Sequence, residues 1–124
     1  MREVIPKVIT LKQHVMNSSR LAMLVAGALV RDLKLFAKGM DDEIVEPSRA
    51  PYVPCYSIVK KEAVRSGALA VTISGAGPSL IAVCEEGDEA KVIKAIKSAY
   101  SSCGIKVTVK VAKPADSAEV IRIM

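Results

Sequence analysis

Residues 66–84 read SGALAVTISGAGPSLIAVC, a stretch with no charged side chain. Leu69–Ser74 and Ser79–Cys84 are rich in residues that favour strands, and Gly75-Ala76-Gly77-Pro78 separates them. A glycine–proline break of this kind would interrupt a membrane-spanning helix where lipid surrounds it. The stretch therefore predicts two buried strands joined by a glycine-rich turn.

Helical spacing predicts helices on both sides of these strands. Leu11–Val30 is apolar around most of its circumference, which is typical of a buried helix, and Asn17-Ser18-Ser19 predicts a break within it. Further helices are expected over Leu33–Lys38, over Tyr56–Ser66 and from Asp88 to Gly104. Asp41–Pro54 carries three prolines and no periodicity, so a loop is expected there.

The C-terminal residues predict further strands. Ile105–Val111 alternates apolar and polar side chains, the period of a half-buried strand. A turn at Lys113–Asp116 leads to a last predicted strand at Glu119–Ile123. This order of elements indicates an α+β domain, in which helices pack on one face of a small, mostly antiparallel sheet. With 124 residues, the chain is expected to form one domain, residues 1–124.

Composition excludes several classes of protein. Hydrophobic residues make up 51% of the chain and charged residues 25%, which excludes a disordered chain. The basic residues behind the net charge of +5 are scattered, and few aromatic rings are available to stack on bases, so no nucleic-acid partner is expected. No membrane partner is expected either. Cys55, Cys84 and Cys103 fit neither a zinc site nor a disulfide framework, which predicts reduced thiols in a cytoplasmic protein.

The first candidate site is the loop that contains Ser74, Gly75, Ala76 and Gly77. Glycines let the backbone approach a ligand closely, and successive N–H groups in such a loop can bind an anion. The alternative is a simple connection between two strands. Because no lysine of the Walker type follows the glycines, the loop is not a P-loop.

The second candidate is the proline-rich loop from Glu46 to Pro54, which holds Arg49. A guanidinium group offers a planar fork of donors that matches a carboxylate or a phosphate. The alternative is a surface arginine paired with Glu46. Asp41-Asp42-Glu43 is interpreted as a solvated loop face rather than a divalent-cation site.

Together these segments resemble the C-terminal half of homoserine kinases in the GHMP kinase superfamily. Gly75–Ser79 matches that superfamily's third motif, G-[AS]-G-P-[ST], and Glu46–Pro54 is similar to the family pattern E-P-Y-R-x-x-L-x-P. Arg2–Lys7 resembles A-R-x-x-L-P-K, and Leu11–Arg20 resembles L-K-x-x-x-x-N-x-x-R. The similarity runs over nearly the whole chain.

The resemblance implies the C-terminal, ferredoxin-like domain of an enzyme that transfers a phosphoryl group from ATP to L-homoserine in threonine biosynthesis. It further implies that Arg49 and Arg2 bind the carboxylate of the amino acid. Ser74, Gly75, Ala76 and Gly77 would give backbone contacts to substrate and phosphates. The complete enzyme would use ATP and Mg²⁺ and would include an N-terminal GHMP domain, and a homodimer is compatible with this reading.

The sequence also departs from the family. Ser48 stands where the family has Tyr, and the family's ATP loop, P-x-x-x-G-L-G-S-S-A, occurs nowhere in the 124 residues. The chain alone is therefore expected to bind neither ATP nor Mg²⁺, to contain no catalytic or metal-ligating residue, and to be inactive. Two alternatives stay open: a stand-alone small-molecule-binding or regulatory domain, and the C-terminal domain of another GHMP kinase.

Overall fold

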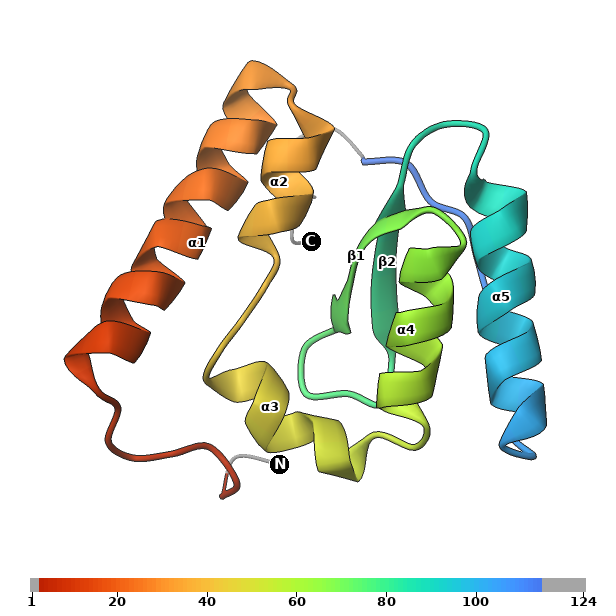
Figure 1. Cartoon of the computed structure of the whole chain (residues 1–124), viewed down its shortest axis with the longest axis horizontal. Helices are drawn as coiled ribbons and strands as arrows, with labels where there is room; N and C mark the ends of the chain where they lie inside the picture. Colours follow the sequence, from red (N-terminus) through yellow and green to blue (C-terminus); the bar gives the residue numbers. More distant parts are fainter. Residues whose placement is uncertain (1–2, 115–124) are drawn as a thin grey trace, which may run out of the picture.

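The structure, a computed structural model, describes residues 3–114 (Figure 1). In chain order its elements are α1 (Leu11–Val30), α2 (Leu33–Gly39), α3 (Val45–Arg49), the 3₁₀ turn η1 (Ala50–Tyr52), α4 (Tyr56–Arg65), β1 (Ala68–Ile73), β2 (Leu80–Cys84) and α5 (Glu89–Ser102). These helices pack against a two-stranded antiparallel sheet, which confirms the predicted α+β class. Among the described helices, none is long and apolar enough to cross a membrane.

The predicted hairpin of strands is present at the centre of the fold. β1 and β2 pair antiparallel, with Val71 opposite Ala82 and Ile73 opposite Leu80. The expectation that both strands are buried holds only for β1, since Val71 is 2% exposed whereas Ile81 in β2 is 47% exposed. The outward side of β2 therefore faces solvent among the described residues.

α4 and α5 lie side by side on one side of the strands, and α1 and α2 stand on the other side (Figure 1). Two apolar clusters fill the space between the strands and α4 and α5. One is built on Ala63, Ala68, Val71 and Val92, and the other on Val59, Ala99 and Tyr100. The core is mainly aliphatic, and Tyr56 and Tyr100 are its aromatic members.

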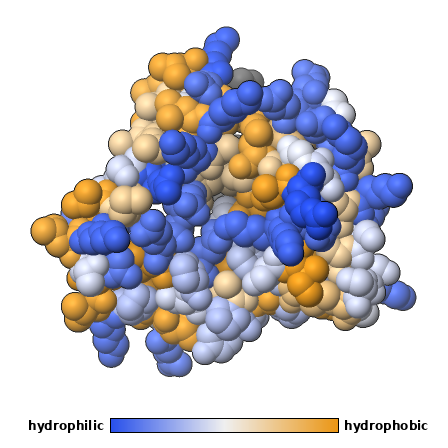
Figure 2. Space-filling view, viewed as in Figure 1, coloured by the Kyte–Doolittle hydropathy of each residue, from blue (hydrophilic) through white to orange (hydrophobic). Residues whose placement is uncertain are grey.

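α1 spans the predicted residues, but two expectations about it are wrong. The helix continues through Ser19, whose hydroxyl donates to the carbonyl of Met16 and so stays within the helix. α1 is also not buried, because it packs mainly on α2 and its only buried residue is Gly27. Figure 2 shows hydrophobic residues gathered along the edge where α1 lies. Apolar residues on most sides of α1 therefore did not mean that the helix is buried among the described residues.

The segment expected to be a loop, Asp41–Pro54, contains α3 and η1. A short helix forms there because the carboxylate of Asp42 accepts hydrogen bonds from the first amides of α3. Pro51 lies within the first two residues of η1, where its missing N–H costs nothing. The prediction of an irregular loop was wrong for about half of this segment.

Ile105–Val111 forms no strand among the described residues, which corrects the prediction. The alternation itself is kept: Ile105, Val107 and Val109 are half-buried, and Lys106 and Thr108 are exposed. Ile105 and Val107 pack against the cluster around Tyr100. The turn predicted at Lys113–Asp116 ends outside the described residues. The last predicted strand, Glu119–Ile123, lies wholly outside them.

The expectation of three reduced thiols is also wrong. Cys55 and Cys103 form a disulfide that joins the start of α4 to the end of α5, and Cys84 is free. The sequence did not predict this disulfide, because it does not tell which two of the three cysteines lie close in space. The bond closes the α4–β1–β2–α5 unit.

Candidate functional site

The glycine loop between β1 and β2 is a compact turn with exposed amides. Ser74 N–H donates to the carbonyl of Ser79 (2.8 Å), and Gly77 N–H donates to the carbonyl of Ser74 (3.1 Å). Gly75 and Gly77 have φ values of 59° and 80°, which glycine adopts without strain. Within residues 3–114, the amides of Gly75 and Ala76 have no acceptor, and both residues are exposed. The loop can therefore offer two N–H groups to an anion.

The structure brings the two candidate loops together. The Nη1 atom of Arg49 donates to the carbonyl oxygen of Gly75 at 2.6 Å. Its Nε atom is buried and has no partner among the described residues. The alternative in which Arg49 pairs with Glu46 is wrong, because Glu46 pairs with Lys60. A guanidinium group therefore lies beside the free amides, and positive character is concentrated at this loop.

Asp42 fixes the start of the helix that carries Arg49. Its carboxylate accepts hydrogen bonds from the amides of Ile44 (2.8 Å), Val45 (3.0 Å) and Glu46 (3.1 Å), and from the side chain of Asn17 (2.8 Å). Burial opposes ionisation, but these hydrogen bonds outweigh it and hold the pKa of Asp42 below its ordinary value. Asp42 is therefore not part of a solvated loop face, as the sequence had suggested.

Asn17 couples this cap to α1. While its amide group donates to Asp42, its carbonyl oxygen accepts from the backbone N–H of Glu43 (3.1 Å). Next to it, the guanidinium group of Arg20 forms an ion pair with Asp41 at 3.1 Å. These contacts explain why Asn and Arg occur at this spacing in α1.

The other residues predicted for the site lie partly in the glycine loop and partly outside the described residues. Ser74, Gly75, Ala76 and Gly77 all lie in the loop beside Arg49. Arg2 lies outside the described residues. Among residues 3–114, no three His, Cys, Asp or Glu side chains lie close enough to hold a metal ion. The acidic run at Asp41 is used for helix capping and ion pairing instead.

Two residues that bind Glu46, in the segment that carries Arg49, were missed by sequence reasoning, namely Lys60 of α4 and Thr72 of β1. Lys60 binds Glu46, and the hydroxyl of Thr72 donates to the other oxygen of Glu46 at 2.9 Å. A polar Thr in an otherwise apolar strand was a signal for such a contact, since a buried polar side chain needs a partner. Lys60 carried no signal, because its spacing is that of an ordinary exposed helix position.

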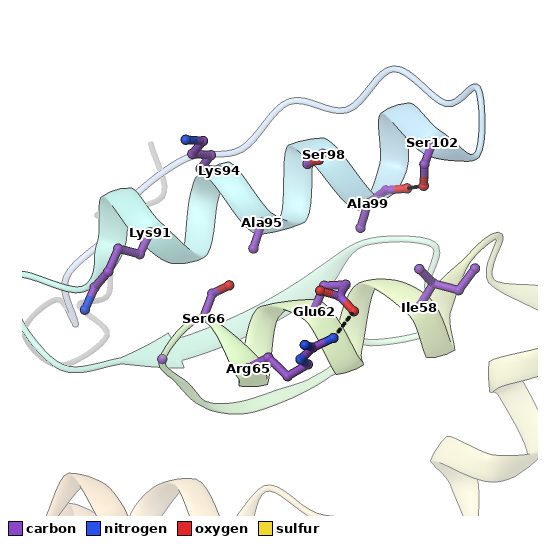
Figure 3. A pocket seen from close by; sticks show the side chains of 11 residues that line it. Ile58, Glu62, Arg65, Ser66, Lys91, Lys94, Ala95, Ser98, Ala99 and Ser102 are labelled. Carbon is purple, nitrogen blue, oxygen red and sulfur yellow. Dashed lines mark hydrogen bonds and ion pairs between the residues drawn. The ribbon is translucent and has the colours of Figure 1, made fainter.

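A groove lies away from this loop. It is an open groove of about 860 Å³ between α4 and α5, and Figure 3 shows small residues such as Ala95, Ala99 and Ser66 along it. Lys91, Lys94 and Arg65 are its basic lining residues. Two of its charged groups already have partners, because Arg65 pairs with Glu62 and Lys91 pairs with Asp88. Nothing in the groove converges on one point, so we place the candidate site at Arg49 and the glycine loop.

Comparisons with known proteins agree on one family. The model described as "GHMP kinases C terminal" matches residues 24–102. The chain is 47% identical over 118 residues to the homoserine kinase of Pyrobaculum neutrophilum, covering 95% of this chain and 40% of that protein. It is 43% identical over 122 residues to that of Aeropyrum pernix, covering 98% and 39%. A crystal structure of homoserine kinase from Cytophaga hutchinsonii superposes with a TM-score of 0.77 at 38% identity, covering 82% of this chain and 32% of that one. The chain thus spans about 40% of the length of its curated relatives.

Proposed function

Because this chain belongs to the GHMP kinase family, and corresponds to a C-terminal region of homoserine kinases, we propose that it forms the substrate-side domain of such an enzyme. The reaction would transfer a phosphoryl group from ATP to the side-chain hydroxyl of L-homoserine, a step of threonine biosynthesis in the cytoplasm. The observation that carries this proposal is the contact between Arg49 and Gly75.

Arg49 would bind the carboxylate of homoserine. One nitrogen of its guanidinium group is occupied by the carbonyl of Gly75, which leaves Nη2 for a ligand, and also Nε if the ligand displaces the groups that cover it. A buried N–H without an acceptor is costly, and a carboxylate oxygen would satisfy it with a charge-assisted hydrogen bond. Arg2 would add a second arginine, as the family resemblance implies.

The glycine loop would bind the oxygens that carry negative charge in the reaction. The amides of Gly75 and Ala76 are exposed, free and held in place by the two hydrogen bonds of the turn. Fixed N–H groups stabilise charge as it develops on a transferring phosphoryl group without having to reorganise. Ser74 and Gly77 would support this by closing the turn.

ATP would supply the phosphoryl group, and Mg²⁺ would neutralise part of its charge. The ATP loop of the family is not found in this sequence, and the described residues contain no cluster of metal ligands. We therefore assign both groups to an N-terminal GHMP domain, and we expect the chain alone to be inactive. Calorimetric titration of the chain with Mg-ATP should show no binding, and micromolar affinity would contradict this assignment.

A chimeric enzyme tests the proposed function. The N-terminal part of the Pyrobaculum neutrophilum kinase would be joined to this chain in place of the 118 residues that match it. We expect ADP release that depends on L-homoserine and is absent with 3-amino-1-propanol, which has the same hydroxyl but no carboxylate. The unmodified Pyrobaculum kinase is the control. A chimera that prefers an acceptor without a carboxylate would point to another GHMP kinase and refute the homoserine assignment.

A further inference from the structure

α3 carries two charged residues that point to the same part of the sheet. Glu46 and Arg49 are three positions apart, so they share one face of the helix. Glu46 accepts a hydrogen bond from Thr72 in β1, and Arg49 donates to Gly75, three residues further along the chain. α3 is thus attached to the strand and to the loop that follows the strand.

Glu46 is a buried carboxylate with a full set of partners. It is 9% exposed, its Oε1 atom is bound by the ammonium group of Lys60, and its Oε2 atom accepts from Thr72 at 2.9 Å. Burial, followed by the neighbouring Glu46, raises the pKa of Tyr56, so the Tyr56 hydroxyl keeps its proton beside this carboxylate. Burying a charge is costly, and a pair of apolar residues would hold two elements together at least as well.

The position of Arg49 depends on such side-chain contacts. With five residues, α3 is too short to be stable by its own backbone hydrogen bonds. Asp42 fixes its first turn, but Arg49 stands at the opposite end. Glu46 is the residue of α3 that bonds both to α4 and to β1, and so sets the distance between the helix and the glycine loop.

We propose that Glu46 is a positioning residue: by holding α3 against Lys60 and Thr72, it keeps the guanidinium group of Arg49 on the carbonyl of Gly75, ready to receive a carboxylate. This inference rests on the proposed function for the carboxylate. The geometric part, in which Glu46 controls Arg49, is independent of which ligand binds. Glu46 itself would not touch the substrate.

Two variants of Glu46 test separately the charge and the length of its side chain. Glu46→Gln keeps the length of the side chain but removes the charge that binds Lys60. Glu46→Asp keeps the charge but is one methylene shorter, so it cannot contact both Lys60 and Thr72. Glu62→Gln is the matched control, because Glu62 is a glutamate of α4 that pairs with Arg65 on the surface.

The readouts are the ¹H–¹⁵N signals of the Arg49 side chain and the Gly75 amide in the 124-residue chain, together with calorimetric titration with L-homoserine. We expect both Glu46 variants to shift or broaden these two signals and to weaken homoserine binding roughly tenfold, while Glu62→Gln changes neither. If either Glu46 variant fails to fold, the other one and Thr72→Val, which removes one partner of Glu46, decide the question.

The outcomes distinguish this inference from the proposed function. Unchanged Arg49 and Gly75 signals in folded Glu46 variants would overturn the positioning role. If the parent chain did not bind homoserine, the carboxylate assignment would fail. The Arg49 and Gly75 signals would then still show whether Glu46 determines the position of the Arg49 guanidinium group.

Discussion

Arg49 is held through one of its three nitrogen atoms, and this limits what can replace it. Nη1 is bonded to Gly75, so a ligand would use the remaining edge of the planar group. Lysine has one nitrogen, which cannot bond to the Gly75 carbonyl and also present two parallel donors to a carboxylate. If Arg49 binds a carboxylate as proposed, we therefore expect an arginine to be required here for geometric as well as electrostatic reasons.

The Arg49→Lys variant of the chimeric kinase should show a homoserine KM raised roughly ten- to a hundredfold, with the ATP KM nearly unchanged. Hydrogen bonds to a charged group contribute about 1.5–3 kcal/mol, which corresponds to this range. Steady-state kinetics with each substrate varied in turn is the measurement. Arg65→Lys, on the surface of α4, is the control. A raised ATP KM with an intact homoserine KM would place Arg49 on the nucleotide side.

The charge of Asp42 should make α3 stable only above acidic pH. Its ionised form accepts the amides of α3, so its pKa is lower in the folded than in the unfolded chain. The stabilisation is thus fully present above the unfolded pKa of about 4 and is lost as pH falls through the lower folded pKa. Asp42→Ala should lower the free energy of unfolding by about 1–2 kcal/mol at pH 7.

Urea denaturation at pH 7 and at pH 3 checks this prediction. The difference between Asp42→Ala and the parent should be smaller at pH 3, because this pH lies below the unfolded pKa of about 4, so that protonation of the unfolded chain reduces the advantage of the folded carboxylate. Glu43→Ala is the control, because Glu43 is exposed beside the same cap. A difference that stayed constant with pH would show that the carboxylate charge has no part in holding α3.

The α1–α2 pair is an element in which two glycines allow a close crossing of backbones. A Cβ atom on Gly39 would lie 2.6 Å from the Cα of Leu24, and one on Gly27 would lie 2.7 Å from the Cα of Phe36. In an exposed helix, replacing glycine by alanine stabilises by about 1 kcal/mol. Here the two helices would have to separate, so steric overlap outweighs helix propensity.

Gly39→Ala should therefore lower the free energy of unfolding by about 1–3 kcal/mol, the usual cost of overpacking. Thermal unfolding followed by circular dichroism is the measurement. Ser18→Ala, at an exposed position of α1, should change stability by less than about 0.5 kcal/mol. If Gly39→Ala raised the melting temperature, the close crossing would be wrong.

The disulfide should be a main source of stability for the α4–β1–β2–α5 unit. Cys55 and Cys103 are separated by 48 residues, and closing a loop of this size lowers the entropy of the unfolded chain by the equivalent of about 4 kcal/mol. Denaturation with and without a reductant should show a loss of that order. Cys84→Ala should respond to the reductant as the parent does, because Cys84 is free. A midpoint that did not change on reduction would contradict the pairing of Cys55 with Cys103.

At the scale of the whole molecule, periodicity predicted the helices and the hairpin because these are local in sequence. α1, the start of α4 and the pairing of β1 with β2 agree with the pattern within a residue or two. The α3 helix was missed although its cap is local, because Asp42 was interpreted as a solvated side chain and the helix has only five residues. The disulfide and the Glu46–Thr72 contact were missed because each joins residues far apart in the sequence. For the candidate site, the sequence singled out the residues and the resemblance linked them, while only the structure supplied the contact between Arg49 and Gly75.

On the scale of the whole molecule, α1 leaves a row of apolar side chains exposed to solvent. On α1, Leu21, Val25 and Leu29 are 62%, 48% and 79% exposed. The uncovered positions follow the four–three spacing of a helix-pairing seam: Leu11, Val15, Ser18, Ala22, Val25 and Leu29.

The seam on α1 predicts that two copies of this chain associate through it. Antiparallel packing of two α1–α2 pairs would form a four-helix arrangement and remove the apolar side chains from water. Light scattering over a range of concentrations should show a shift from monomer to dimer. Val25→Glu combined with Leu29→Glu should keep the chain monomeric with unchanged helix content, because both side chains are exposed in the single copy. Ile58→Glu on α4, which is 50% exposed, should leave association intact. A parent chain that stayed monomeric at millimolar concentration would rule out this seam as a contact between copies.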